Sequence, residues 1–379
     1  MKRHRPASTA LFVLFLASVA AQAQPTPAKL IADFESGDST RCMNAVNATS
    51  EHQEHFQTTA AKIAPALLRI IESGKGCEDS ALSGLLNLGP GILPAAPAAK
   101  TVPQLVRIME RGIESGHHEH LSSAASALLI LGFYQKDAAA AVPLIDRWIR
   151  LPAVSHFHRE AVQALAVIGD GAAPAVPTLL EILGRPAGAE HDPQTEWLRM
   201  EIVRALGSIP AAAARSGPAL VTALSGEAPD LASKAADSLG KLGRAALPYV
   251  LPLIRSANED IKERAVRVVV KMGPAATEAV PLIVPLIAAD NWNVRYQVQE
   301  ALTAMGPTPE VITALAAMVV TKDKEEAATE AIKMLGSYGP AASKALPELR
   351  KAAATKGQFN WSPLAEAAKE AIAKIETKQ

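Results

Sequence analysis

One phrase recurs along most of this 379-residue chain and restricts what the chain can fold into. Each copy ends a helix-forming stretch at Gly or Pro, continues with small residues and then reaches another Pro. A repeat of this length is one supersecondary unit that buries its apolar face only by stacking on its neighbours. The copies align on Gly89, Gly132, Gly169, Pro210, Gly243, Gly273, Gly306 and Gly339, with spacings of 43, 37, 41, 33, 30, 33 and 33 residues. The earlier units contain insertions, notably the loop at 185–194.

The unit at 275–305 predicts a pair of helices. Residues 275–289 form its first helix, called helix A, in which Pro281 and Pro285 are expected to introduce kinks. The second, helix B, follows at 290–306, with Asp290 or Asn291 as its cap and Gly306 as its end. The apolar residues of helix B recur along one face of a helix, at Val294, Val298, Ala301, Leu302 and Met305.

The predicted fold class is all-α, because alanine dominates the composition and aromatic residues make up only 4%. We expect an α-solenoid of about nine stacked helical pairs, with the first helix A near 61–73 and the last helix B near 362–377. The predicted organisation is a signal peptide at 1–23, an N-terminal helical cap at 24–59 and the repeat solenoid at 60–379.

The repeats resemble HEAT repeats, and the units of 30–33 residues are similar to the short subclass known from phycobilisome lyases. Val294-Arg295 matches the motif of that subclass near the start of helix B, and Leu198-Arg199 and Ile261-Lys262 match it approximately. Phe157-His158 departs from it. The resemblance covers about residues 60–378. It implies an armadillo-like right-handed superhelix whose B helices line a concave, partner-binding face.

The N-terminus has the order of a secretory signal peptide. Residues 1–5 are basic, 10–20 are apolar, and Ala21-Gln22-Ala23 offers small residues for cleavage near Ala23. A membrane anchor is the alternative, but the apolar run is short of the roughly 20 residues that span a bilayer. We therefore expect a periplasmic or secreted protein without stable membrane insertion.

Charge and motifs exclude several functions. Cleavage removes Lys2, Arg3 and Arg5, which takes the net charge from +0 to about −3, so no basic excess indicates nucleic-acid binding. The sequence has no phosphate-binding loop, nucleophile elbow or HExxH motif. These observations predict a protein that is not an enzyme and needs no cofactor.

The two cysteines, Cys42 and Cys77, are expected to form a disulfide, since export places them in an oxidising compartment. The alternative is two buried free thiols. The bridge would fasten the N-terminal segment to the first repeat.

Aromatic and arginine side chains near B-helix starts are the candidate partner contacts, because Trp, Tyr and Arg are enriched at interface hot spots. Alternatively, each Trp packs against an adjacent loop, and Arg295 pairs with the Asp of a neighbouring unit. The predicted partner-binding residues are Trp197, Arg199, Trp292, Arg295 and Tyr296.

Histidines gather near the starts of two neighbouring B helices, about one repeat apart. Imidazoles at such positions can share a transition metal if the side chains converge. The candidate metal ligands are His118, His120, His156 and His158. A polar cluster at helix starts or a pH-responsive surface explains the same residues without a metal.

The function that the sequence favours is an exported, non-catalytic scaffold or adaptor that binds a protein or peptide on the concave face. The alternative is a metal-binding protein that uses the histidine cluster, and a third possibility is a purely structural role in the cell envelope. The sequence specifies no oligomeric state.

Overall fold

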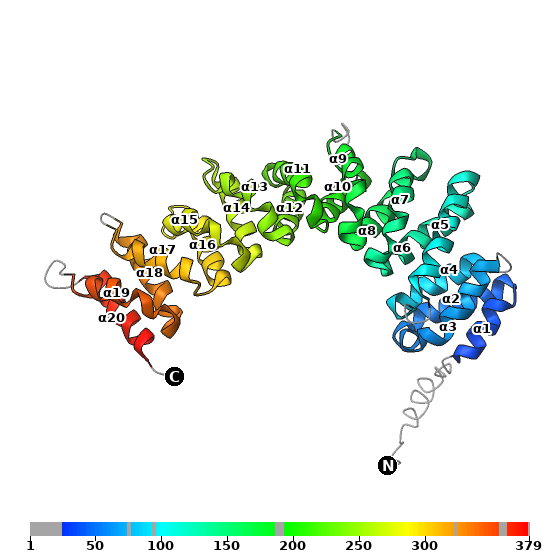
Figure 1. Cartoon of the computed structure of the whole chain (residues 1–379), viewed down its shortest axis with the longest axis horizontal. Coiled ribbons are helices and arrows are strands. Elements are labelled where there is room, and N and C mark those ends of the chain that lie inside the picture. The colour runs from blue at the N-terminus through cyan, green and yellow to red at the C-terminus, as the bar shows by residue number, and fades with distance from the viewer. Residues whose placement is uncertain are drawn as a thin grey trace, which may run out of the picture. The chain divides into compact units, whose positions relative to one another are not determined.

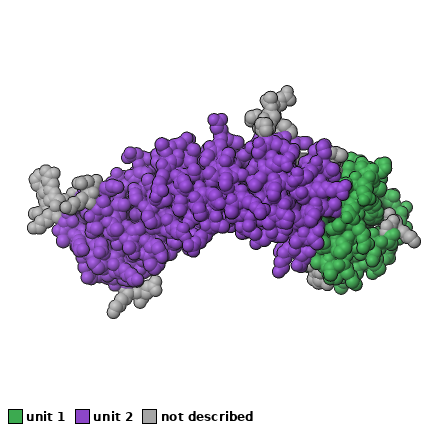
Figure 2. Space-filling view, turned by 45° about the horizontal axis from the view of Figure 1, so that its top comes forward, with its two compact units in different colours: residues 1–134 green, residues 135–379 purple. Residues whose placement is uncertain are grey.

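The computed structural model describes residues 25–73, 77–92, 96–185, 193–321, 324–355 and 362–377, and every element in these ranges is a helix. The predicted all-α class is therefore confirmed. The chain forms two compact units, residues 1–134 (unit 1) and 135–379 (unit 2), which Figure 2 colours separately. The predicted signal peptide at 1–23 and most of the 185–194 loop lie outside the described residues.

Unit 1 contains three helical pairs that stack on one another. Helix α1 packs on α3 and α2 on α4, so the predicted cap is itself a stacked pair, and α5 packs on α6. The boundary predicted between residues 59 and 60 falls inside α3, which runs through it without a break. The elements are α1 (Pro27–Glu35), α2 (Ser39–Glu51), α3 (Gln53–Ser73), α4 (Glu78–Leu88), η1 (Gly89–Ile92), α5 (Ala98–Ser115) and α6 (His118–Phe133).

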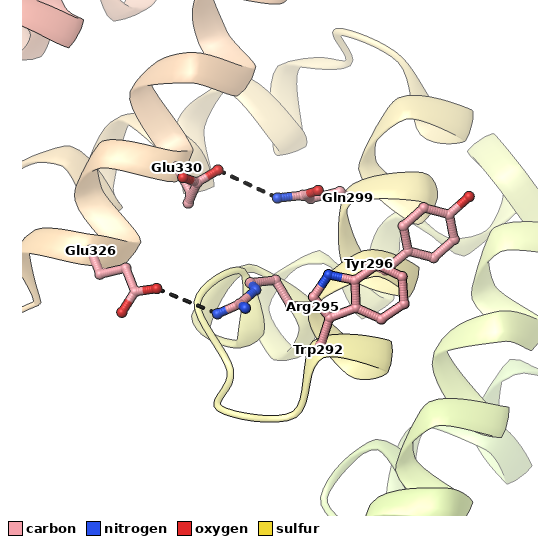
Figure 3. Close-up of a pocket in the computed structure, with 6 residues that line it drawn as sticks. All are labelled: Trp292, Arg295, Tyr296, Gln299, Glu326 and Glu330. Carbon is pink, nitrogen blue, oxygen red and sulfur yellow. Dashed lines mark hydrogen bonds and ion pairs between the residues drawn. The ribbon is translucent and has the colours of Figure 1, made fainter.

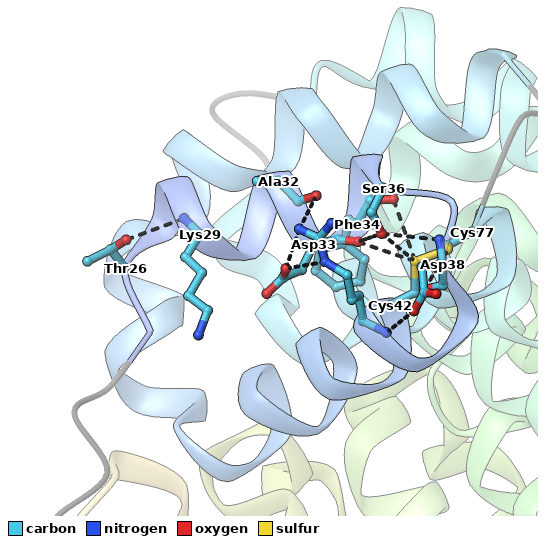
Figure 4. Close-up of polar contacts among 10 residues, drawn as sticks. Thr26, Lys29, Ala32, Asp33, Phe34, Ser36, Asp38, Cys42 and Cys77 are labelled. Carbon is cyan, nitrogen blue, oxygen red and sulfur yellow. Dashed lines mark hydrogen bonds and ion pairs between the residues drawn. A yellow bond between two sulfur atoms is a disulfide. The ribbon is translucent and has the colours of Figure 1, made fainter.

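The N-terminal pair is fastened by covalent and polar contacts (Figure 4). Cys42 of α2 is fully buried and forms the predicted disulfide with Cys77, which precedes α4; their Cα atoms are 6.3 Å apart. Asp38 caps α2 by accepting from the Arg41 backbone N–H at 2.8 Å, and the Arg41 guanidinium donates to Asp33 of α1. The disulfide therefore ties α2 to the first repeat, and the Arg41–Asp33 contact ties α1 to α2.

Unit 2 contains seven helical pairs, which Figure 1 shows as two layers, one of A helices and one of B helices. Together with α3/α4 and α5/α6 they make nine pairs in the described residues, as the repeat predicted. The A helices are α7 (Val142–Ile149), α9 (Val176–Leu183), α11 (Ala213–Ser225), α13 (Leu247–Ile254), α15 (Val280–Ile283), α17 (Pro309–Val319) and α19 (Leu346–Ala353). The B helices are α8 (His158–Ile168), α10 (Pro193–Leu206), α12 (Pro229–Leu242), α14 (Glu259–Met272), α16 (Trp292–Met305), α18 (Glu325–Ser337) and α20 (Pro363–Glu376).

Short 3₁₀ segments join most B helices to the next A helix. Helix A, predicted over 275–289 with kinks at Pro281 and Pro285, is divided into η7, α15 and η8, with Pro281 in the first turn of α15 and Pro285 in the first turn of η8. The 3₁₀ segments of unit 2 are η2 (Gln135–Ala141), η3 (Pro152–Phe157), η4 (Gly169–Ala175), η5 (Pro210–Ala212), η6 (Gly243–Ala246), η7 (Gly273–Ala279), η8 (Val284–Leu286) and η9 (Gly339–Ala345).

Left-handed backbone at the turn explains most of the aligned glycines. Gly306, for example, ends α16 with φ of +71°, a conformation that side chains disfavour. Gly132 is an exception, because it lies inside α6 and the positive φ falls on Gln135 instead. Gly207, which directly follows α10, has a different role. A Cβ at this position would overlap Ser238 of α12, so glycine permits close stacking of these two B helices.

Two stretches, His158–Leu183 and Glu259–Leu286, are long and apolar enough to cross a membrane by length and composition alone. Each stretch consists of a B helix followed by the next A segment. The chain turns between these two parts at Gly169 in the first stretch and at Gly273 in the second, and both glycines have positive φ. About half of each apolar window is buried inside the fold, 44% and 50% respectively. The requirements of a stacked helical pair therefore account for both stretches.

Candidate functional site

Three of the five predicted contact residues are large side chains that the fold leaves exposed. Trp197 is 58% exposed, Trp292 63% and Tyr296 45%. More than half of each tryptophan side chain is therefore accessible to solvent. A solvated indole is costly to leave uncovered, and contiguous exposed apolar groups are typical of interaction surfaces.

Trp292 and Tyr296 form a stacked pair on the first turn of α16 (Figure 3). Their ring centroids are 5.5 Å apart and the ring planes differ by 17°. Asn291 starts the helix by accepting from the backbone N–H groups of Asn293 and Val294, as predicted. Since Val294 and the other apolar residues of α16 face the core, helical geometry turns positions 292 and 296 outward together.

A cavity of about 300 Å³ opens beside this pair, between α16 and α18. Its lining is Trp292, Arg295, Tyr296 and Gln299 from α16, with Glu326 and Glu330 from α18. These two helices pack less closely than every other neighbouring pair of B helices in unit 2. The chain is also different here: Gly306 leads directly to Thr308, which caps α17, with no 3₁₀ segment between.

Polar side chains bridge the cavity (Figure 3). Arg295 Nη1 donates to Glu326 Oε1 at 3.4 Å, and Gln299 Nε2 donates to Glu330 Oε2 at 3.4 Å. Glu330 also pairs with Lys333 on its own helix, at 2.7 Å. Both bridges are long and partly solvated, so each contributes less than about 1 kcal/mol and yields readily to another partner.

Arg295 of α16 and Arg199 of α10 both have a structural role. Arg295 Nη1 donates to the Ala289 carbonyl at 3.2 Å, and Arg199 Nη1 donates to the Arg185 carbonyl at 2.9 Å. Each thereby holds the loop between its A and B helices. For Arg295 the predicted alternative is pairing with an Asp of a neighbouring unit; the residue it pairs with is instead Glu326 of the next unit. Arg199 is only 20% exposed in its side chain, which leaves it little surface for a partner.

Tyr338 ties the far end of the same two helices together. Its Oη donates to the Leu302 carbonyl of α16 at 2.7 Å, and burial raises the pKa of Tyr338 to about 12. The cavity therefore lies between helices that are linked at one end and bridged only by solvated side chains at the other.

This raised pKa predicts alkaline sensitivity of unit 2. The folded state keeps the phenol proton up to about pH 12, whereas the unfolded chain loses it near pH 10. The contribution to stability is complete below pH 10 and is lost as the pH rises from 10 to 12. Urea unfolding followed by circular dichroism at pH 9 and pH 11 should show a larger loss for wild type than for Tyr338→Phe. Equal losses in both proteins would contradict the assignment.

The predicted histidine ligands make other contacts. His120 Nδ1 lies 2.9 Å from Ser115 Oγ, and His158 Nε2 lies 3.1 Å from the Leu151 carbonyl. His118 is exposed at the start of α6, and the side chain of His156 lies outside the described part of the chain. Within the residues that are described, no three His, Cys, Asp or Glu side chains are grouped to hold a metal ion. The metal site stays a prediction.

Sequence reasoning missed Gln299, Glu326 and Glu330. Glu326 and Glu330 come from the next repeat, where the Val-Arg motif is replaced by Ala327-Ala328. The period of 33 residues gives a usable signal, because it aligns the start of α18 with that of α16 and so places α18 opposite Trp292.

Comparison with known proteins gives one sequence match and several structural ones. The family model described as HEAT repeats matches residues 247–336. No curated protein sequence matches the chain. Crystalline importin beta in an ammonium sulfate condition is 14% identical, with a TM-score of 0.48, covering 92% of this chain and 52% of that one. Kap121p bound to the extreme C-terminus of the protein phosphatase Cdc14p is 12% identical, with a TM-score of 0.47 and coverages of 95% and 47%. The chain spans about half the length of these proteins.

Proposed function

The chain carries HEAT repeats, and on this premise we propose that it is an exported, non-catalytic scaffold that binds a protein or peptide on the B-helix layer of unit 2. The observation that carries the proposal is the exposed, stacked pair of Trp292 and Tyr296 at the rim of the α16/α18 cavity. Rigid aromatic side chains bury a large area at a small cost in side-chain entropy, which makes them effective anchors.

Export is supported by two independent features. The basic and apolar order of residues 1–23 is that of a signal peptide. The Cys42–Cys77 disulfide supports export, because disulfides persist in oxidising compartments such as the periplasm or the extracellular space. The resemblance to the short, phycobilisome-lyase type of HEAT repeat is part of this proposal. It concerns the form of the repeat, and we propose no lyase activity.

A crosslinked pull-down from cell-envelope extract tests the proposal. Wild type, Trp292→Ala/Tyr296→Ala and Met43→Ala are compared; Met43 is an exposed apolar side chain of unit 1, outside the proposed surface. A partner should be retained by wild type and Met43→Ala and lost by the double variant. With that partner purified, the double variant should bind at least about 30-fold more weakly, as expected for two hot-spot residues.

Thermal melting provides the control for folding. Both aromatic side chains are exposed, so the double variant should melt within a few degrees of wild type. Retention of the same partners by a folded double variant would refute the proposed surface. Arg295→Glu is a poorer probe, because Arg295 also holds the Ala289 carbonyl.

A further inference from the structure

The α16/α18 cavity has an equivalent two repeats earlier, between α12 and α14. That groove, of about 340 Å³, is lined by the first, fourth, fifth and eighth residues of α12, namely Pro229, Ala232, Ser233 and Ala236. The α16 wall of the first cavity uses the same four positions, Trp292, Arg295, Tyr296 and Gln299. The opposite walls share the second and sixth positions, Asp260 and Arg264 in α14 and Glu326 and Glu330 in α18.

The side chains at these shared positions differ in chemistry between the two grooves. The α12/α14 groove has small side chains on one wall, and on the other Arg264 donates to the Leu224 and Gly226 carbonyls while Arg267 pairs with Glu263. The lining of the α16/α18 cavity instead contains two stacked rings, Trp292 and Tyr296, and two carboxylates that accept hydrogen bonds from Arg295 and Gln299. Of these two grooves, only the α16/α18 cavity therefore combines an aromatic surface with acidic groups.

The charge of the α16/α18 cavity is negative. Its lining carries two carboxylates, Glu326 and Glu330, against one cation, Arg295, a net charge of −1. Arg295 is itself held by the Ala289 carbonyl and Glu326, and the Glu326 side chain remains 73% exposed. The Glu326 carboxylate is thus open to an additional cation, whereas Glu330 is already paired with Lys333.

From this arrangement we infer that the bound segment places a lysine or arginine side chain in the α16/α18 cavity, between the Trp292–Tyr296 rings and the Glu326 and Glu330 carboxylates. A cation over an aromatic face gains from the negative charge of that face, and a carboxylate within reach adds an ion pair. A long aliphatic stem followed by a charged head matches this order of apolar rim and acidic wall. The inference rests on the proposed function and names the chemistry of its partner.

Selection of displayed random eight-residue peptides on the purified full chain tests it. Peptides that bind wild type but not Trp292→Ala/Tyr296→Ala should contain Lys or Arg at one recurring position. Replacing that residue with Gln should weaken binding roughly five- to tenfold, the sum of one cation–π contact and one exposed ion pair. Glu326→Gln/Glu330→Gln removes only the ion pair and keeps the aromatic pair, so it should weaken the basic peptide by roughly two- to fivefold and leave the Gln peptide unchanged.

The equivalent groove supplies the matched control. Asp260→Asn/Glu263→Gln removes two carboxylates from the α12/α14 groove and should not affect the basic peptide. Peptides that need the aromatic pair but lack a basic residue, or that bind Glu326→Gln/Glu330→Gln unchanged, would overturn the inference and leave the proposed function standing. Failure to select any peptide that depends on Trp292 and Tyr296 would count against both.

Discussion

Replacing Trp148 with alanine is expected to lower the free energy of unfolding of unit 2 by about 3–5 kcal/mol. Trp148 lies on α7 and is 0% exposed. It is the largest fully buried side chain among the described residues. It packs near Phe157, with ring centroids 6.5 Å apart and planes tilted by 47°. Truncation removes the transfer free energy of the indole and leaves a cavity that the stacked helices fill only in part.

A second substitution at Trp148 separates its volume from its polar atom. Trp148 Nε1 is buried, and no hydrogen-bond acceptor for it is found in the described chain. Trp148→Phe keeps most of the apolar volume and removes this unsatisfied N–H, so it should cost less than half of what Trp148→Ala costs. Urea unfolding followed by circular dichroism measures both. An alanine variant that loses under about 1 kcal/mol would show that Trp148 is not a core residue.

Loss of the disulfide is the second large expected effect. Cys42→Ser/Cys77→Ser should destabilise unit 1 by about 3–4 kcal/mol in the chain-entropy model, since the bridge closes a loop of 35 residues. The effect concentrates on α1 and α2, which contact the rest of unit 1 mainly through α3 and α4. Limited proteolysis should therefore cut the double variant first within residues 25–51.

A reducing agent distinguishes the bridge from the packing of its side chains. Dithiothreitol should lower the melting temperature of wild type toward that of Cys42→Ser/Cys77→Ser and leave the double variant unchanged. Met43→Ser, an exposed position beside Cys42 on the same helix, should respond to the reductant as wild type does. If the reductant changes none of the three proteins, the cysteines are not bonded in solution.

Local signals in the sequence determined where many of the helices begin and end. Asn291 caps α16, Ser362 with Pro363 starts α20, and Gly306 closes α16, each by satisfying or breaking hydrogen bonds within a few residues. These features depend on neighbours along the chain only, so the sequence contains all that they require. The kinks predicted at Pro281 and Pro285 appear as a division of helix A into η7, α15 and η8, which local rules describe only as a kink.

Helical periodicity also determined which tryptophan is exposed. Trp148 falls in phase with Val142, Ile145 and Ile149, all buried, whereas Trp292 falls outside the apolar stripe of α16. Each phase follows from 3.6 residues per turn and the positions of apolar residues, so exposure of Trp292 can be read from the sequence.

Only the tertiary structure decided what lies opposite Trp292. The cavity exists because α16 and α18 pack loosely, and the carboxylates that line it, Glu326 and Glu330, belong to the next repeat. The separation of two stacked helices depends on the side chains of both repeats and on the turn between them, which here lacks the usual 3₁₀ segment. Such packing between residues about 30 positions apart is a property of the assembled core, and no periodicity within one helix specifies it.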